Sequence, residues 1–298
     1  MRPPTVLVAL VLVAALGVKT AAAQPGLGAQ GAEGEPHRLQ QWRVPSTDPG
    51  AAARAVLFRP PGEGPFPLAV IAHASTQNVL RRAQMPQPEY RTLAAWLVAR
   101  GFAVLVPERP GHGAGGKYLE DQGGCDEADY ARAGRVTADE IAAATGLLRQ
   151  QSFIRPGSVV VIGHSAGAWG ALALASADPK NVAAIIAFAP GRGGHANDLP
   201  GKVCAPHTLI AAAGEFGKAA RAKVTWLVAA NDSYFLPAFS RQLADAFRAG
   251  GGKVDFHVLA AHGSEGHWLP ETATGVALAG AELDRALKAR SAAAGKKR

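Results

Sequence analysis

The segment Gly163-His164-Ser165-Ala166-Gly167 has the composition of a tight turn that carries a serine nucleophile. Residues 159–162 read as a buried strand directly before it, and residues 168–177 read as a helix directly after it. A turn between a strand and a helix raises the serine hydroxyl above the edge of a sheet. We therefore interpret Ser165 as a candidate nucleophile; the alternative is a glycine turn in which the serine is idle.

A serine hydroxyl is a weak nucleophile, so it needs a base, and the base needs an acid to orient it. Asp232 follows the apolar run 225–230 and lies downstream of Ser165, which makes it the candidate acid. Its alternative role is a cap or an Asx turn before the helix that we expect to begin at Pro237.

Two histidines, His262 and His267, lie downstream of Asp232 and could supply the base. His267 follows a Gly-Ser-Glu-Gly stretch, and such a loop can reach back over the sheet. His262 is closer to the strand that precedes both, so we expect it to have a structural role. We select His267 as the candidate base.

Acyl transfer also requires two donors for the oxyanion of the tetrahedral intermediate. The backbone N–H of Ala166, directly after the nucleophile, should be one of them. The other should come from the loop after an early strand, where we assign the N–H of Ser75 and keep Thr76 as the alternative. His73 in that loop and His164 in the turn are expected to be packed or hydrogen-bonded histidines.

Short apolar runs alternate with helical patterns along the rest of the chain. Most of the runs are continuously apolar, as expected for strands covered on both faces. The pattern Thr137-Ala138-Asp139-Glu140 predicts the start of a helix. The expected strands are 54–58, 68–73, 102–106, 158–162, 182–188, 224–230 and 254–259. This alternation predicts an α/β fold with a doubly wound, mostly parallel sheet and small cap insertions after strands.

The ends of the chain differ in composition from the middle. Residues 1–23 read as a signal peptide, with Arg2 before an apolar run and small residues at 21–23, although a retained membrane anchor is the alternative. We expect a flexible leader at 24–50, one hydrolytic domain at 51–290 and a disordered tail at 291–298. After cleavage we expect an exported protein with no stable membrane insertion.

The 298-residue chain carries a formal net charge of +8 at pH 7. The charge is spread along the chain, and the dense basic cluster 296–298 lies in the expected tail. Without a basic helix face or an aromatic-interleaved patch, we expect no nucleic-acid partner. The sequence leaves the oligomeric state open.

Cys125 and Cys204 are the two cysteines of the sequence. An even number of cysteines in an exported chain favours a disulfide between them. A metal pair or a reactive thiol is the alternative, but there is no CxxC spacing and no clustered histidine. We therefore expect a disulfide, no metal and no organic cofactor. The two cysteines fall in insertions, at 113–135 and 190–206, so their bond would fix one wall of the substrate pocket.

Five segments, taken in order, resemble the dienelactone hydrolase-like branch of the α/β-hydrolases. They are His73-Ala74-Ser75, residues 107–113 (Pro-Glu-Arg-Pro-Gly-His-Gly), the serine turn, residues 231–235 (Asn-Asp-Ser-Tyr-Phe) and Gly266-His267-Trp268. The resemblance covers about residues 54–290 and implies the α/β-hydrolase fold and hydrolysis of an ester or similar acyl bond. It also implies the roles of nucleophile, acid and base for Ser165, Asp232 and His267.

Two features depart from that family. The founding dienelactone enzymes use a cysteine nucleophile where this chain has Ser165, so their lactone substrate does not carry over. The usual His-Gly after the early strand is His73-Ala74 here, which affects the expected geometry of the loop that supplies the second oxyanion donor.

We therefore expect an exported serine hydrolase that cleaves a small-molecule carboxylic ester through an acyl-enzyme. A peptidase or amidase of the same fold is the nearest alternative. A non-catalytic binding protein on this scaffold is a further one, because fold does not dictate function.

Overall fold

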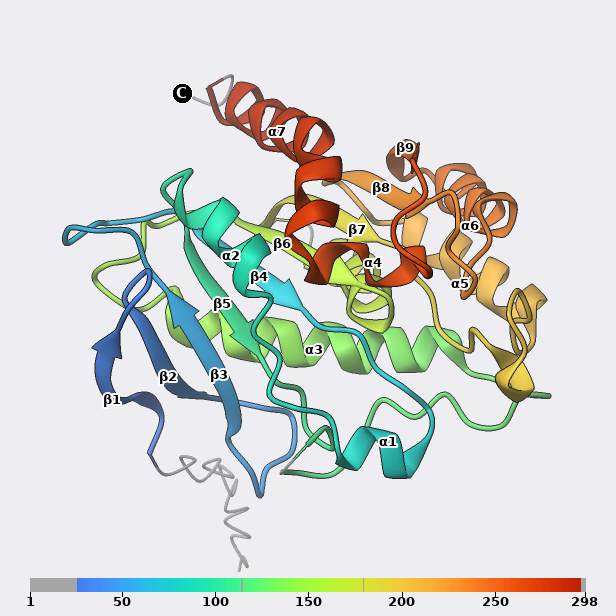
Figure 1. The fold of residues 1–298 in the computed structure, drawn as a ribbon, viewed down its shortest axis with the longest axis horizontal. Coiled ribbons are helices and arrows are strands. Elements are labelled where there is room, and N and C mark those ends of the chain that lie inside the picture. Colours follow the sequence, from blue (N-terminus) through green and yellow to red (C-terminus); the bar gives the residue numbers. More distant parts are fainter. Residues whose placement is uncertain (1–25, 114, 179, 296–298) are drawn as a thin grey trace, which may run out of the picture.

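The computed structural model describes residues 26–113, 115–178 and 180–295, with side chains as far as residue 288. The expected signal peptide lies outside these residues. Within them, nine strands form one sheet in the order β1-β2-β3-β5-β4-β6-β7-β8-β9 (Figure 1). The strands are β1 (Gly28–Gly34), β2 (Leu39–Val44), β3 (Ala53–Phe58), β4 (Leu68–Ala72), β5 (Ala103–Pro107), β6 (Val159–His164), β7 (Val182–Phe188), β8 (Lys223–Ala229) and β9 (Lys253–Leu259).

The sheet is antiparallel at one end and parallel over the rest. Strands β1, β2, β3 and β5 pair antiparallel, whereas β5, β4, β6, β7, β8 and β9 pair parallel. In an open parallel sheet, ligands bind outside the carboxyl ends of the strands. The loops after β4, β6, β7, β8 and β9 therefore share the edge where a site is expected, and we call this the catalytic edge.

Helices cover both faces of the sheet. They are α1 (Val79–Ala83), α2 (Arg91–Val98), α3 (Tyr130–Leu148), α4 (Ala166–Ala177), α5 (Pro206–Gly217), α6 (Pro237–Ala249) and α7 (Ala273–Gly295), with short 3₁₀ turns η1 (Ala196–Asp198) and η2 (Gly266–Glu271). One core cluster joins α3, α4, α5 and α6 to one face of the sheet, and the other joins α2 and α7 to the opposite face. In β4, Val70 belongs to the first cluster and its neighbour Ile71 to the second. This explains why the strand sequences are apolar throughout.

Three boundaries differ from the sequence-based expectation. Residues 28–34 and 39–44, expected in a flexible leader, form β1 and β2, because Trp42 and Val44 bury their side chains while β1 pairs along an exposed edge. Helix α7 continues to Gly295, five residues into the expected tail. Helix α3 begins at Tyr130 and is capped by the side chain of Asp129, so the pattern at 137–140 does not start it.

Candidate active site

Ser165 occupies a strained turn between β6 and α4. Its φ is 54° and its ψ is −117°, a conformation that costs free energy for any residue with a Cβ. A methyl group at position 163 would overlap the Ala168 backbone, and one at 167 would overlap the Ala72 carbonyl oxygen. Glycine is therefore required at both positions for the strand, the helix and the loop after β4 to meet. This is the geometry that the serine turn predicts.

Asp232 and His267 form a buried hydrogen-bonded pair after β8 and β9. The Nδ1 of His267 lies 2.9 Å from Oδ2 of Asp232, and both side chains are almost fully buried. The other carboxylate oxygen, Oδ1, accepts the backbone N–H groups of Tyr234 and Phe235 at 2.9 and 2.8 Å. These two bonds fix the carboxylate plane. The pair therefore favours the tautomer of His267 with its proton on Nδ1, the arrangement that a candidate base with Nε2 as acceptor requires.

His262 has a different environment. Its Nε2 lies 2.8 Å from the hydroxyl of Thr272, and its backbone N–H donates to Oδ1 of Asn231 at 2.8 Å. The side-chain amide of Asn231 also donates to the carbonyls of His262 and Gly263. The hydrogen bonds of Asn231 thus fix the position of the loop that leads to His267. The His262 ring contacts Thr272 and makes no hydrogen bond to Asp232 among the described residues.

His164, the residue before the candidate nucleophile, contacts the loop of the candidate base. Its Nε2 lies 2.8 Å from the carbonyl oxygen of His267, and the two rings are 5.0 Å apart between centroids. Burial lowers the pKa of His164, more than hydrogen bonding to Glu271 raises it. Its Nε2–H donates to the His267 carbonyl, while Nδ1 lies 2.8 Å from the Tyr90 hydroxyl oxygen and 3.3 Å from Oε1 of Glu271. The structure thus brings the serine turn and the Asp232–His267 pair together.

The loop after β4 is held by a different side chain at each residue. The Nε2 of His73 accepts the backbone N–H of Arg109 at 3.0 Å, which places the histidine proton on Nδ1. The N–H of Ala74 donates to the Tyr90 hydroxyl at 3.2 Å, and Oγ of Ser75 lies 2.6 Å from Nε2 of His112. His73 and His164 are therefore buried, hydrogen-bonded histidines, which confirms the expectation for both.

The two expected oxyanion donors lie on neighbouring segments. The N–H of Ala74 is engaged by Tyr90, whereas none of the described residues accepts a hydrogen bond from the N–H of Ser75. Ala166 is the first residue of α4, where backbone N–H groups have no partner within the helix. Ala74 stands where the resembling family has glycine, and its φ is not positive, so this position does not require glycine. The arrangement suits Ser75 and Ala166 as donors.

A buried ionic cluster lies behind this loop, and the sequence analysis missed it. Glu120 accepts from Nε of Arg109 at 2.7 Å and is also paired with Arg192, and all three side chains are almost fully buried. Arg109 also donates to the His73 carbonyl at 2.8 Å. Burial, with Arg109 nearby, lowers the pKa of His112 to about 2, so His112 is neutral. No local pattern indicates these pairings, because the partners are far apart in the sequence.

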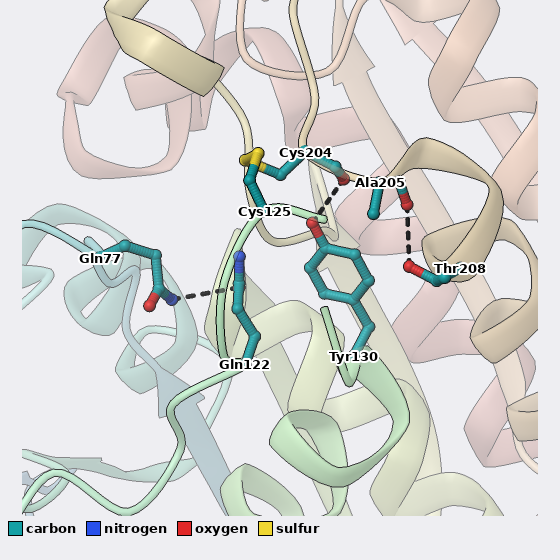
Figure 2. Close-up of a disulfide and its surroundings, with 7 residues drawn as sticks. All are labelled: Gln77, Gln122, Cys125, Tyr130, Cys204, Ala205 and Thr208. Atoms are coloured by element: carbon teal, nitrogen blue, oxygen red, sulfur yellow. Dashed lines mark hydrogen bonds between the residues drawn. A yellow bond between two sulfur atoms is a disulfide. The ribbon is translucent and has the colours of Figure 1, made fainter. Parts of the chain in front are cut away.

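Cys125 and Cys204 form a disulfide across 79 positions of sequence, as expected (Figure 2). Next to it, the Tyr130 hydroxyl donates to the Cys204 carbonyl at 2.6 Å. Gln122, three residues before Cys125, accepts from the side chain of Gln77 at 3.1 Å. The disulfide thus joins the insertion before α3 to the one before α5, and Gln77 links both to the loop after β4.

Two further observations concern metals and membranes. Within the described part of the chain, no three His, Cys, Asp or Glu side chains are grouped as metal ligands would be. Within the same residues, every helix is too short or too polar to cross a bilayer.

The family model described as serine aminopeptidase, S33, matches residues 87–225. This range includes Ser165 and ends before Asp232 and His267. No curated protein matches the sequence.

Similar solved structures include a cold-adapted esterase from an Arctic intertidal metagenomic library, with a TM-score of 0.55, 16% identity and coverage of 85% of this chain and 98% of that one. Est1E from Butyrivibrio proteoclasticus, solved with ferulic acid, gives a TM-score of 0.57 and 15% identity, with 81% of this chain and 98% of that one covered. The acylaminoacyl peptidase of Pyrococcus horikoshii gives 0.56 and 12%, and 80% of this chain spans only 39% of that protein. Taken with the parallel sheet and the serine turn, these likenesses show that the chain has the α/β-hydrolase fold.

Proposed function

We propose that the protein is a serine hydrolase that cleaves carboxylic esters through an acyl-enzyme. The observation that carries the proposal is the strained turn at Ser165, whose neighbour His164 contacts the His267 residue of the buried Asp232–His267 pair. A nucleophile held in strained backbone and a base oriented by a carboxylate are the parts that acyl transfer requires. The esterase neighbours support the proposal at the level of the fold.

The geometry leads to a two-step reaction. The Ser165 oxygen attacks the ester carbonyl carbon while Nε2 of His267 takes the hydroxyl proton, and Asp232 stabilises the resulting imidazolium. The N–H groups of Ser75 and Ala166 bind the oxyanion. Collapse of the intermediate breaks the bond to the alcohol oxygen, which receives the proton from His267. Water then attacks the acyl-enzyme, with His267 again as base, and releases the acid and free Ser165.

The test compares Ser165→Ala with the wild type on p-nitrophenyl acetate and on a fluorophosphonate probe. Loss of the nucleophile should lower kcat about 10⁶-fold and abolish labelling. Ser240→Ala is the matched control, because Ser240 is a buried serine of α6 whose hydroxyl accepts from Nε1 of Trp226 in β8. Labelling of the Ser165→Ala protein would contradict the assignment. Absence of labelling in the folded wild type would favour a non-catalytic binding protein.

A peptidase is the second candidate, favoured by the description of the family model that matches residues 87–225. Ester and amide substrates require the same nucleophile and base, so the triad does not separate them. The test compares p-nitrophenyl esters with p-nitroanilides of the same acyl group. A kcat/KM that is higher for the anilide would replace the esterase proposal with the peptidase.

The finer assignment to the dienelactone hydrolase-like branch and the export of the protein belong to the same proposal. The segments at 107–113 and 231–235 support the branch, with Ser165 excluding a cysteine mechanism. The Cys125–Cys204 disulfide supports export, because disulfides persist in oxidising compartments. Sequencing the amino terminus of the protein from its native host tests export, and an intact residue 1 would contradict cleavage.

A further inference from the structure

Large apolar side chains are exposed around the candidate active site. Five of them lie on the loops of the catalytic edge: Val79 and Leu80 on α1, Leu199 after η1, Leu236 before α6, and Trp268 in η2. We call these five residues the apolar rim. Leu80 is 75% exposed and Val79 is 66% exposed. Isolated exposed apolar residues need no explanation, but a group of them around one site indicates a binding surface.

Contacts between neighbouring loops connect the segments of the rim in one series, from α1 through η1 and the loop before α6 to η2. Arg81 of α1 lies 3.7 Å from Asp198, the residue before Leu199. The Gly201 N–H donates to the Ser233 carbonyl at 2.6 Å, which brings the loop after η1 against the loop that carries Leu236. Tyr234 in that second loop has its ring 5.9 Å from Trp268 and 4.3 Å from His267. The rim therefore reaches the candidate base.

The strand order places the nucleophile between the two sides of the rim. Val79 and Leu80 follow β4, on one side of β6, and the other three rim residues follow β7, β8 and β9, on the opposite side. Ser165 directly follows β6. A molecule whose carbonyl carbon lies at Ser165 therefore has rim residues on both sides.

We propose that the preferred substrate is an ester with an extended apolar chain, which lies between the two sides of the rim while its carbonyl is at Ser165. The inference rests on the proposed esterase function. Each methylene that leaves water on binding should raise kcat/KM about fourfold. Because the rim lies on both sides of Ser165, the chain can belong to the acyl or to the alcohol part of the ester, and both are tested.

The experiment measures kcat/KM for p-nitrophenyl acetate, butyrate, hexanoate and octanoate, and for ethyl and octyl acetate. In the wild type, kcat/KM should rise with chain length in one of the two series. Leu80→Ser and Leu199→Ser, one from each side, should each lower the ratio of long-chain to short-chain kcat/KM about tenfold. The matched controls are Leu278→Ser on α7 and Val258→Ser on β9, which are exposed apolar residues outside the rim; they should keep the wild-type ratio.

Three results would overturn the inference. One is a kcat/KM that does not depend on chain length in either series. The second is a loss of the ratio in Leu278→Ser that equals the loss in Leu80→Ser. The third is co-sedimentation with phosphatidylcholine vesicles that Leu80→Ser abolishes while the ratio stays constant, which would make the rim a membrane-docking surface. A wild type that hydrolyses no ester would instead overturn the proposed function, and this substrate class with it.

Discussion

The floor of the candidate site and its rim are built by opposite means. The floor consists of the buried polar side chains His73, Tyr90, His112 and His164. Tyr90 and His112 are hydrogen-bonded to the loop after β4, His73 of that loop accepts from Arg109, and His164 donates to the carbonyl of His267. The rim consists of exposed apolar side chains on loops that a disulfide and an exposed ion pair hold together. Buried hydrogen bonds fix the positions of the groups they join. Exposed apolar surface lowers the free energy of the system only when a ligand covers it and removes it from water. We infer that the floor determines the rate of the chemistry and the rim determines which ester is chosen.

Asp232→Asn should give the largest effect and should act on the floor alone. An amide at this position donates to Nδ1 of His267, so the proton moves to Nε2 and the base is lost; kcat should fall about 10⁴-fold. The long-chain to short-chain ratio should not change. The measurement is kcat on p-nitrophenyl acetate and octanoate, with Asp284→Asn, in a surface ion pair with Arg100, as the control. Full turnover by Asp232→Asn would show that another residue is the acid.

The disulfide connects the two regions, and its removal should change the free energy of unfolding more than it changes kcat. Replacing Cys125 and Cys204 with serine frees a loop across 79 positions, and the loop-entropy model assigns roughly 4 kcal/mol of unfolding free energy to such a closure. The measurement is urea denaturation, with oxidised and reduced wild type alongside. The Gln77–Gln122 hydrogen bond connects this segment to the loop after β4, which carries the proposed donor Ser75. Freeing the segment should displace that loop slightly, so kcat should fall by less than about tenfold. An unfolding free energy equal to that of the oxidised wild type would contradict the constraint.

Tyr90→Phe tests whether the floor positions the catalytic groups. The variant keeps the ring but leaves the Ala74 N–H without its partner, at a cost of about 1–3 kcal/mol for the unsatisfied group. It also removes the hydroxyl from Nδ1 of His164, which still faces Oε1 of Glu271 at 3.3 Å. A small displacement of the oxyanion loop against the base should lower kcat about tenfold to a hundredfold while KM changes little.

The measurement for Tyr90→Phe is kcat together with inhibition by a trifluoromethyl ketone, a mimic of the tetrahedral intermediate. Affinity for the ketone should fall in parallel with kcat, which a loss of global stability would not produce. Ser240→Ala again serves as the control, since it also deletes a buried hydrogen bond. If the ketone binds as tightly as it does to the wild type, Tyr90 does not position the loop.

The contrast between floor and rim also explains what the sequence could predict. The strands can be predicted because each is an apolar run, and Ser165 can be proposed because a glycine-flanked serine between a strand and a helix is a local pattern. Asp232 and His267 are proposed from their order after Ser165 and their positions after strands. Strand β1 was missed because its residues face solvent and it forms by pairing with β2. The start of α3 differs from the prediction because Thr137, a residue type that often caps helices, lies inside the helix and donates its hydroxyl to the Ala133 carbonyl.

The floor residues left no local signal, because each of them also makes a hydrogen bond to a segment that is distant in sequence. Tyr90 and His164 are 74 positions apart, and His112 and Ser75 are 37 apart. Tyr90 also has a positive φ of 47°, which an analysis of residue types does not anticipate. The rim side chains can be recognised as apolar from the sequence, but their exposure depends on how four loops meet at one edge.

The smallest predicted effect concerns pH, and it separates the floor from the rim once more. Burial lowers the pKa of His73, His112 and His164, that of His112 to about 2, so folding favours the neutral form of each ring. In the unfolded chain a histidine takes up a proton near pH 6.5. Above that pH the histidine carries no proton in either the folded or the unfolded state, so the pKa shift contributes nothing to the unfolding free energy. Below it the unfolded state binds more protons, so the unfolding free energy falls as the pH falls.

His112→Gln should make this pH dependence shallower. One fewer proton bound on unfolding corresponds to a slope smaller by about 1.4 kcal/mol per pH unit below about pH 6. Urea denaturation at a series of pH values from about 5 to 8 measures the slope. His207→Gln, at an exposed position on α5, is the control for the histidine, and Leu80→Ser is the control for the rim; both should keep the wild-type slope. A slope for His112→Gln that equals the wild-type slope would show that His112 is not held neutral, and the floor would then not be the rigid, uncharged support on which the comparison depends.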